Sequence, residues 1–310
     1  MIAVLAGGVG AARFLEGLVA LVDESEITVV GNTGDDATLY GLHVSPDLDT
    51  VTYTLAGAGN RETGWGLAGD SFQAMGSLDR YEVPTWFRLG DKDLATSLFR
   101  TTRLAEGATL SEVTAEISAA WRLRLCLLPM SDDEVRTRLR LADGAEVDFQ
   151  EYFVRLRHDV AVASIVYRGA EEASPAPGVV AALTAAEVIV VAPSNPLLSI
   201  APILAVPAIG ALLRGRRERV VAISPIVAGR ALRGPADHLL AELGHEPSAA
   251  GVARFIAPYA GCLVIDTADA HLGGEVSAAG VRAVVADSVM RTREVAASLA
   301  RIALDSAGRP

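Results

Sequence analysis

The chain opens with Met1-Ile-Ala-Val-Leu-Ala-Gly-Gly-Val-Gly-Ala-Ala-Arg13, and this stretch decides the fold. An apolar run typical of a buried strand stops at Gly7-Gly8, turns through Gly10 and continues as a helix-like segment. A glycine-rich turn between a strand and a helix brings backbone N–H groups up to a phosphate. We therefore expect a nucleotide or diphosphate here, held by Gly7, Gly8, Gly10 and Arg13. The alternative is a tight turn whose glycines serve close packing only.

The spacing of these glycines excludes the two commonest nucleotide motifs. Gly7-Gly8-x-Gly10 lacks the third glycine of the dinucleotide fingerprint, and the chain has no Gly-Lys-Ser/Thr motif. The second expected strand ends in Gly31-Asn32, where a dinucleotide site would carry an acidic residue. An NAD-dependent oxidoreductase is therefore disfavoured.

Short apolar runs recur along the chain and predict a parallel sheet. They cover residues 2–5, 27–30, 188–191, 220–223 and 262–265, and helical patterns separate them. Further strands are expected at 123–128 and 146–154, and helices at 94–104 and 110–121. The fold class is α/β, with a doubly wound, mostly parallel, Rossmann-like sheet. We assign 1–56 and 123–310 to the nucleotide-binding core and 57–122 to a helical insertion.

Composition narrows the class of protein. With 310 residues, 51% of them hydrophobic and 21% charged, the chain can bury a large core. A formal charge of −11 argues against nucleic-acid partners, because a phosphate backbone is held by clustered cations. The sequence shows neither an uninterrupted apolar run of membrane-spanning length nor a leader pattern, so we expect no membrane partner and a cytoplasmic location. Cys126 and Cys262 are expected to be buried free thiols.

A pair of carboxylates follows the second expected strand. Asp47 and Asp49 stand two residues apart in Ser45-Pro-Asp-Leu-Asp-Thr50, and on a turn or on the first turn of a helix both could reach one Mg²⁺. Magnesium usually takes one or two carboxylates together with phosphate oxygens of a substrate. The alternative is a helix start, in which Ser45 or Asp47 caps the first turn.

Polar turns at other strand ends indicate nucleotide contacts. Asn32 follows the second strand, while Ser194, Asn195 and Ser224 follow later ones. Ligands of doubly wound sheets bind at this edge. Since no histidine lies near either serine in the sequence, we favour binding over nucleophilic catalysis. Arg88 begins the charged turn 88–93, for which the alternative is a solvated helix cap.

Eight segments in this order resemble the 2-phospho-L-lactate transferase family, whose actinobacterial members are phosphoenolpyruvate transferases. The segments are Ala6-Gly-Gly-Val-Gly10 with Arg13, Gly31-Asn-Thr-Gly-Asp-Asp36, Ser45-Pro-Asp-Leu-Asp-Thr-Val51 with Tyr53-Thr-Leu55, Gly64-Trp65-Gly66, Leu89-Gly-Asp-Lys-Asp93, Leu128-Pro-Met-Ser-Asp-Asp133, Pro193-Ser-Asn-Pro196 and Ile223-Ser-Pro-Ile226. The resemblance spans nearly the whole chain.

The resemblance implies a step in coenzyme F(420) biosynthesis. Members move a phosphoenolpyruvyl or 2-phospholactyl group from a guanosine-diphosphate-linked donor to the ribityl hydroxyl of 7,8-didemethyl-8-hydroxy-5-deazariboflavin. They release GMP and use Mg²⁺. The resemblance also implies a homodimer. By similarity, Asp49 and Arg88 would contact the deazaflavin, with Asp49 near the attacked hydroxyl and the metal. Whether Asp49 acts as base or only as metal ligand stays open.

Two further alternatives remain open at this point. The arginine and alanine bias suggests a GC-rich actinobacterium and hence the enolpyruvyl donor, an argument from composition alone. A related family of gluconeogenesis factors, nucleotide-sugar-binding regulators without turnover, shares the glycine-rich start. Ser45-Pro-Asp-Leu-Asp49 and Leu89-Gly-Asp-Lys-Asp93 favour the transferase.

Overall fold

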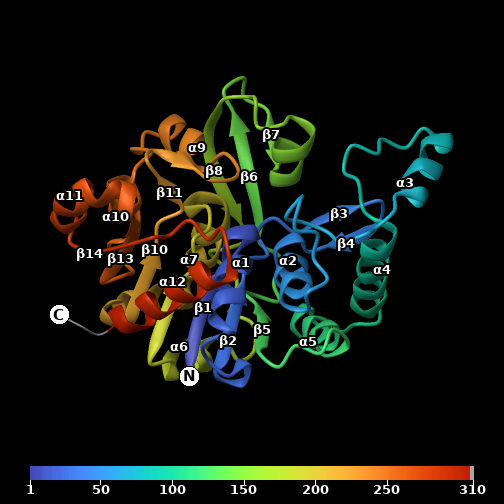
Figure 1. The fold of residues 1–310 in the computed structure, drawn as a ribbon. Coiled ribbons are helices and arrows are strands. Elements are labelled where there is room, and N and C mark those ends of the chain that lie inside the picture. Colours follow the sequence, from blue (N-terminus) through green and yellow to red (C-terminus); the bar gives the residue numbers. More distant parts are fainter. Residues whose placement is uncertain (308–310) are drawn as a thin grey trace.

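A parallel seven-stranded sheet forms the centre of the molecule in the computed structural model, which describes residues 1–307 (Figure 1). Its order is β14-β13-β10-β9-β1-β2-β5, and every neighbouring pair is parallel. The strands are β1 (Ile2–Ala6), β2 (Ile27–Gly31), β5 (Cys126–Pro129), β9 (Val188–Val191), β10 (Val220–Ile223), β13 (Cys262–Asp266) and β14 (Arg282–Ala286). The predicted doubly wound sheet is confirmed, and the winding direction reverses between β1 and β9.

Both faces of the sheet are buried, which explains its continuous apolar strands. In β1, Ala3 and Leu5 belong to one hydrophobic core while Ile2 and Val4 belong to the other, because successive side chains alternate between faces. One core contains helices α1 (Gly8–Leu18), α2 (Pro46–Leu55) and α12 (Arg293–Ser306). The other contains α6 (Val179–Ala185), α7 (Ala201–Ala205), α8 (Pro207–Gly215), α9 (Ala236–Glu242), α10 (Ala249–Ile256) and α11 (Gly273–Ala278).

The stretch assigned to the insertion carries α3 (Gln73–Leu78), α4 (Asp91–Ala105) and α5 (Leu110–Ala120). The helices predicted at 94–104 and 110–121 are thereby confirmed. A small hydrophobic cluster of Val44, Met75 and Leu89 joins this stretch to the hairpin β3 (Ala37–Leu39) and β4 (Leu42–Val44). The division of the chain at 56/57 and 122/123 stays a prediction.

A second, antiparallel sheet lies beyond the carboxyl ends of the parallel strands (Figure 1). Its strands are β6 (Arg136–Leu141), β7 (Glu146–Asp148) and β8 (Val162–Arg168). The strand predicted over 146–154 is wrong beyond residue 148, where the chain turns into a π-helical segment, Glu151–Arg155. This turn stacks the rings of Phe149 and Phe153, whose centroids are 5.5 Å apart, and a strand would not bring them together.

The strand predicted over 123–128 begins later than expected. Leu123 donates its backbone N–H to Ser118 O at the end of α5, and the strand starts at Cys126. Cys126 is exposed because β5 is an edge strand, so the prediction that it is buried is wrong. Cys262, in the interior strand β13, is buried as expected.

Shorter elements complete the described chain. A two-stranded ribbon is formed by β11 (Ile226–Val227) and β12 (Arg230–Ala231). Single helical turns occur at Glu24–Glu26, Asp79–Tyr81, Pro196–Ile200, Arg217–Arg219 and Thr267–Leu272. Within residues 1–307 no single helix is long and apolar enough to cross a membrane, although the bent pair Pro196–Ala205 and Pro207–Gly215 passes by length and composition.

Candidate functional site

A cavity of about 760 Å³ opens at the carboxyl ends of the parallel strands. Ligands of doubly wound sheets bind at this edge, beside the point where the strand order reverses. The predicted site residues on its wall are Gly7, Gly8, Gly10, Arg13, Asp47, Asp49, Arg88, Ser194, Asn195 and Ser224. Segments from the start, middle and end of the chain therefore meet in one place.

The three glycines of the first turn have different surroundings. A Cβ on Gly7 would lie 2.6 Å from Ser199 Cβ, and one on Gly10 would lie 2.1 Å from the backbone oxygen of Pro193. Both glycines are therefore required for close packing. Gly8 has φ +72°. Within residues 1–307, a Cβ added to Gly8 would have one heavy atom of another residue within 4 Å, Asp47 Oδ1 at 3.8 Å. Of the three glycines in this turn, only Gly8 combines a backbone conformation that favours glycine with space for a ligand to approach.

Asn32 lies behind the cavity wall. It is fully buried, and its amide Nδ2 donates to Asp35 Oδ1 at 2.9 Å and to Asp47 Oδ2 at 3.0 Å. Asp35 and Asp47 both line the cavity. The structure therefore places Asn32 where it orients two carboxylates, and any influence on a ligand passes through them.

Asp47 and Asp49 lie in the first turn of α2, and each is only 5% exposed. The segment folds as the first turn of a helix, one of the two settings expected from the sequence for this pair. Residues two apart on a helix lie about 200° apart around its axis and do not face each other. Asp47 is grouped with Asp35 through Asn32, whereas Asp49 forms an ion pair with Arg100 of α4.

The capping alternative for this segment also differs from what the structure shows. Ser45 is the N-cap residue of α2, but within residues 1–307 its side chain makes no capping hydrogen bond. Its Oγ donates instead to Asp36 Oδ2 at 2.7 Å. The acidic residues of the first turn therefore face the cavity and its surroundings while lying near the positive end of the helix dipole.

These residues fit a divalent cation. Asp49 Oδ2 is buried and has no hydrogen-bond partner in the described chain, and Asp49 lines the cavity. No group of three or more His, Cys, Asp or Glu side chains in residues 1–307 is arranged to hold a metal on its own. Magnesium commonly takes one or two carboxylates and completes its shell with water and phosphate oxygens. The arrangement therefore suits an ion that arrives with a phosphate.

Burial shifts the ionisation of this acidic wall. It raises the pKa of Asp47 to about 7, although the amide of Asn32 and the backbone N–H of Gly8 oppose the rise. Burial, reinforced by the charges of Asp47 and Asp36, raises the pKa of Asp35. Burial and the nearby Asp49 raise the pKa of Asp93 to about 7. Positive charge in the cavity would favour the ionised forms.

We expect Asp93→Asn to stabilise the protein without ligand above neutral pH. Tyr53 donates its hydroxyl to Asp93 Oδ1 at 2.7 Å, and an asparagine oxygen can accept the same bond without charge. The pKa of Asp93 is about 7 in the folded protein and 3.8 for an ordinary aspartate. The folded state therefore loses stability relative to the unfolded state as the pH rises from 3.8 to about 7. The advantage of Asp93→Asn in denaturant unfolding should grow by about 2 kcal/mol from pH 5 to pH 8.

Asp91 provides the control for this measurement, since it lies in the same helical turn. Its carboxylate accepts hydrogen bonds from Ser71 and from backbone N–H groups, which lower its pKa. Asp91→Asn should therefore destabilise the protein at pH 8. If the unfolding free energies of Asp93→Asn and the unaltered protein differed by the same amount at about pH 5 and pH 8, the raised pKa of Asp93 would be contradicted.

One wall of the cavity is aromatic. It carries Trp65, Trp86, Phe87, Phe149 and Phe153. Arg88 also lines the cavity, and its guanidinium carbon lies 4.7 Å from the centre of the Phe72 ring. An aromatic wall with an oriented arginine suits a flat, polar-edged ring system.

The polar residues after β9 and β10 are partly occupied by local hydrogen bonds. Asn195 Oδ1 accepts the backbone N–H groups of Leu197 and Leu198 at 3.0 and 3.1 Å, which caps the following helical turn. Ser224 Oγ bonds to the backbone of Ile226. Ser194 Oγ is buried and has no partner within residues 1–307. Of these three predicted nucleotide contacts, Ser194 offers the free hydroxyl.

Several wall residues were not predicted. Sequence reasoning missed Asp35, Tyr53, Asp93, Gln150, Arg233 and Arg291 on the wall, and Arg100 behind it. Tyr53 and Asp93 stand inside segments that carried the family resemblance, which was the available signal. For Arg100, a single arginine in an amphipathic helix pattern gave none.

Comparisons with known proteins find similarity along nearly the whole chain. The family model described as 2-phospho-L-lactate transferase CofD matches residues 2–302. A phosphoenolpyruvate transferase of Streptomyces griseus is 48% identical, covering 99% of this chain and 98% of its own. A phosphoenolpyruvate transferase of Mycolicibacterium smegmatis is 39% identical, with the same coverage. A crystal structure of a UPF0052 family protein from Bacillus halodurans matches 98% of both chains with TM-score 0.68 and 16% identity, which supports the fold alone.

Proposed function

The chain belongs to the 2-phospho-L-lactate transferase family and is a transferase of phosphate-containing groups, and on this premise we propose that it transfers a phosphoenolpyruvyl group. The proposed donor is the guanosine-diphosphate-linked form of this acid. The proposed acceptor is the ribityl hydroxyl of 7,8-didemethyl-8-hydroxy-5-deazariboflavin, in coenzyme F(420) biosynthesis. Relatives named phosphoenolpyruvate transferase support the enolpyruvyl donor over the lactyl one.

One observation carries the proposal. The glycine turn, the carboxylates of α2 and the aromatic wall with Arg88 line the same cavity. A donor diphosphate at Gly8 would lie beside Asp47, because Gly8 is adjacent to that carboxylate. A planar acceptor ring would lie against the aromatic wall. Its hydroxyl tail would then reach toward Asp49.

The proposed reaction is a displacement at phosphorus. The acceptor oxygen forms a bond to the phosphorus that carries the enolpyruvyl group, the bond from that phosphorus to the GMP oxygen breaks, and the hydroxyl proton leaves. Positioning and charge neutralisation do most of the work in such transfers. In this proposal Asp49 would hold or receive the hydroxyl proton and Arg13 would offset phosphate charge, and both residues line the cavity. Mg²⁺ would supply further neutralisation of the diphosphate, with Asp49 and Asp47 as its candidate ligands on the cavity wall.

The test is incubation of the purified protein with the deazaflavin, Mg²⁺ and each guanylylated donor, followed by mass spectrometry. We expect GMP and a product heavier by the phosphoenolpyruvyl group. A shift in deazaflavin fluorescence without product would instead support a regulator that binds without turnover. If the protein neither bound the deazaflavin nor formed product with either donor, the proposal would be refuted. A homodimer in the cytoplasm is part of the same proposal, and its assembly is measurable by light scattering.

We expect Arg88→Ala to weaken use of the acceptor far more than use of the donor. The planar guanidinium can donate to ring oxygens or stack on the ring, and alanine removes both interactions. The apparent KM for the deazaflavin should rise about tenfold or more, with a change of less than about threefold for the donor. Arg88→Lys keeps the charge and should fall between the two. Equal effects on both substrates would place Arg88 at the diphosphate.

A further inference from the structure

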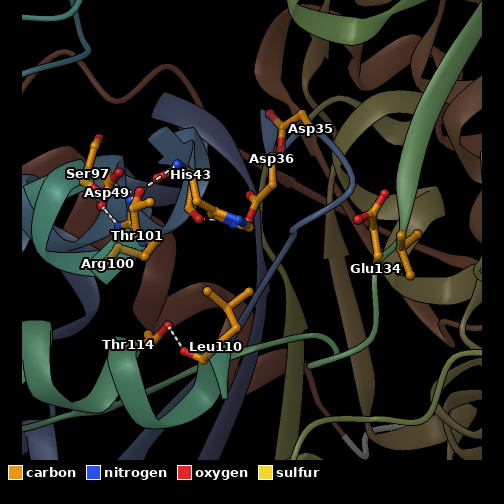
Figure 2. A network of polar contacts seen from close by, with 12 residues as sticks. Asp35, Asp36, His43, Asp49, Ser97, Arg100, Thr101, Leu110, Thr114 and Glu134 are labelled. Atoms are coloured by element: carbon orange, nitrogen blue, oxygen red, sulfur yellow. Dashed lines mark hydrogen bonds and ion pairs between the residues drawn. The ribbon is translucent and has the colours of Figure 1, made fainter. Parts of the chain in front are cut away.

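Arg100 is a buried arginine that the proposed chemistry does not yet use. It lies in α4 and is 1% exposed, and its Nη2 donates to Asp49 Oδ1 in an ion pair that spans 51 residues of sequence (Figure 2). Its Nη1 also donates to the backbone oxygen of His43 at 3.3 Å. The guanidinium therefore contacts both α2 and the strand that leads into it.

Stability alone is a weak reason for such a pair. Removing an arginine and a carboxylate from water costs free energy that their attraction only partly returns, and apolar replacements of similar volume are often as stable. The pair is also incompletely satisfied, because Arg100 Nε and Asp49 Oδ2 have no hydrogen-bond partner in the described residues. Of the two residues, only Asp49 lines the cavity. The unsatisfied carboxylate oxygen thus belongs to the residue that a ligand can reach.

The surrounding bonds hold α4 firmly against α2 and β4. His43 donates its backbone N–H to Thr101 Oγ1 at 2.7 Å, and its ring Nε2 lies 2.9 Å from Asp36 Oδ2 (Figure 2). At the start of α4, Asp93 accepts the hydroxyl of Tyr53. The segment directly before α4 carries Trp86, Phe87 and Arg88, which line the cavity. Helix α4 therefore links the expected acceptor wall to the carboxylate beside the attacked hydroxyl.

We propose that Arg100 is a positioning residue that fixes Asp49 through Oδ1 and leaves Oδ2 free for the acceptor hydroxyl or its cation. This inference rests on the proposed function. Arg100 acts through Asp49 and does not itself touch substrate. Loss of a residue that orients a ligand-binding group commonly costs about 10- to 100-fold in activity or affinity.

The kinetic test uses Arg100→Met, Arg100→Lys and the double variant with Asp49→Asn. Arg100→Met should lower kcat about 10- to 100-fold while changing the apparent KM for the deazaflavin less than about threefold, and Arg100→Lys should recover part of the loss. The double variant should be no slower than Asp49→Asn, because the arginine acts only through that carboxylate. Additive losses in the double variant, or no loss in Arg100→Met, would overturn the proposal.

Arg103→Met is the matched control, since Arg103 lies one turn further along α4 and forms ion pairs with Glu106 and Glu116. It is expected to leave kcat unchanged. If Arg103→Met lowered kcat as much as Arg100→Met does, general damage to α4 would explain both losses and the proposal would fail.

Two readouts without turnover separate this proposal from the proposed function. In thermal unfolding without ligand, Arg100→Met should lower the midpoint, and adding Asp49→Asn should restore part of it because the uncompensated buried charge is gone. In calorimetry with GDP and Mg²⁺, Arg100→Met should weaken binding about tenfold or more, and Arg103→Met should not. If the unaltered protein gave no transfer product, the proposed function would fail, and these two measurements would still decide for or against Arg100.

Discussion

Gly10→Val is expected to destabilise the protein strongly, whereas Gly8→Ala is expected to leave it folded and to weaken its binding of a diphosphate. A Cβ at residue 10 would lie 2.1 Å from the backbone oxygen of Pro193, and neither backbone can move without disturbing α1 and the end of β9. Loss of about 3 kcal/mol or more of unfolding free energy follows from such a clash. A Cβ at residue 8 would make only an ordinary contact with Asp47 Oδ1 at 3.8 Å, and the left-handed backbone would cost about 1–2 kcal/mol.

The matched control for Gly8→Ala is Gly41→Ala. Gly41 lies in the β3–β4 hairpin with φ +79°, and in residues 1–307 its added Cβ would meet nothing within 4 Å. Both variants should therefore lose similar stability in urea unfolding. Only Gly8→Ala should weaken GDP binding, by about tenfold or more, because its methyl group occupies the approach to the backbone N–H groups. If Gly8→Ala bound GDP as tightly as Gly41→Ala does, the glycines of residues 7–10 would have a packing role only.

The contrast between these glycines shows what the sequence could and could not predict. A strand, a glycine turn and a helix are local features, so the pattern of residues 1–22 was sufficient to predict β1 and α1, and the glycines at their junction line the cavity. Which glycine serves the ligand depends on atoms from elsewhere in the chain. Pro193 and Ser199 approach the turn from the segment that follows β9, and a single sequence carries no record of that approach.

Strands β6 and β8 of the second sheet were not predicted. In β6 the charged Arg136, Arg138 and Arg140 alternate with Thr137, Leu139 and Leu141, a period-two pattern typical of a half-buried strand that could have been used. The sequence does not show that β6 pairs with β8 as well as with β7, because that pairing depends on how the later segment folds back. The buried partner of Asp49 was hidden in the same way. An arginine in an amphipathic helix is usually solvated, and only the packing of α4 against α2 brings Arg100 to the carboxylate.

Asp49→Asn is expected to lower turnover by about two to four orders of magnitude, the range for losing general-base or electrostatic help. The substitution keeps the shape of the side chain and removes its charge. The oxygen Oδ2 of Asp49 is buried and has no hydrogen-bond partner in the described chain. In the proposed function it contacts the acceptor hydroxyl or its cation, so the substitution would weaken that contact directly. Unfolding must be measured alongside, because the Arg100 guanidinium then faces a neutral amide.

Asp47→Asn is expected to behave differently, and the comparison is the decisive measurement. The carboxylate of Asp47 is already engaged by Asn32 and by the backbone N–H of Gly8, so it has less capacity to serve the reacting hydroxyl. Its loss should mainly weaken the proposed Mg²⁺ site, and raised Mg²⁺ should partly restore the rate. Turnover against Mg²⁺ concentration for both variants separates the roles. Full activity of Asp49→Asn at ordinary Mg²⁺ would refute its assignment, and equal rescue of both variants would reduce Asp49 to a metal ligand without a separate role toward the hydroxyl.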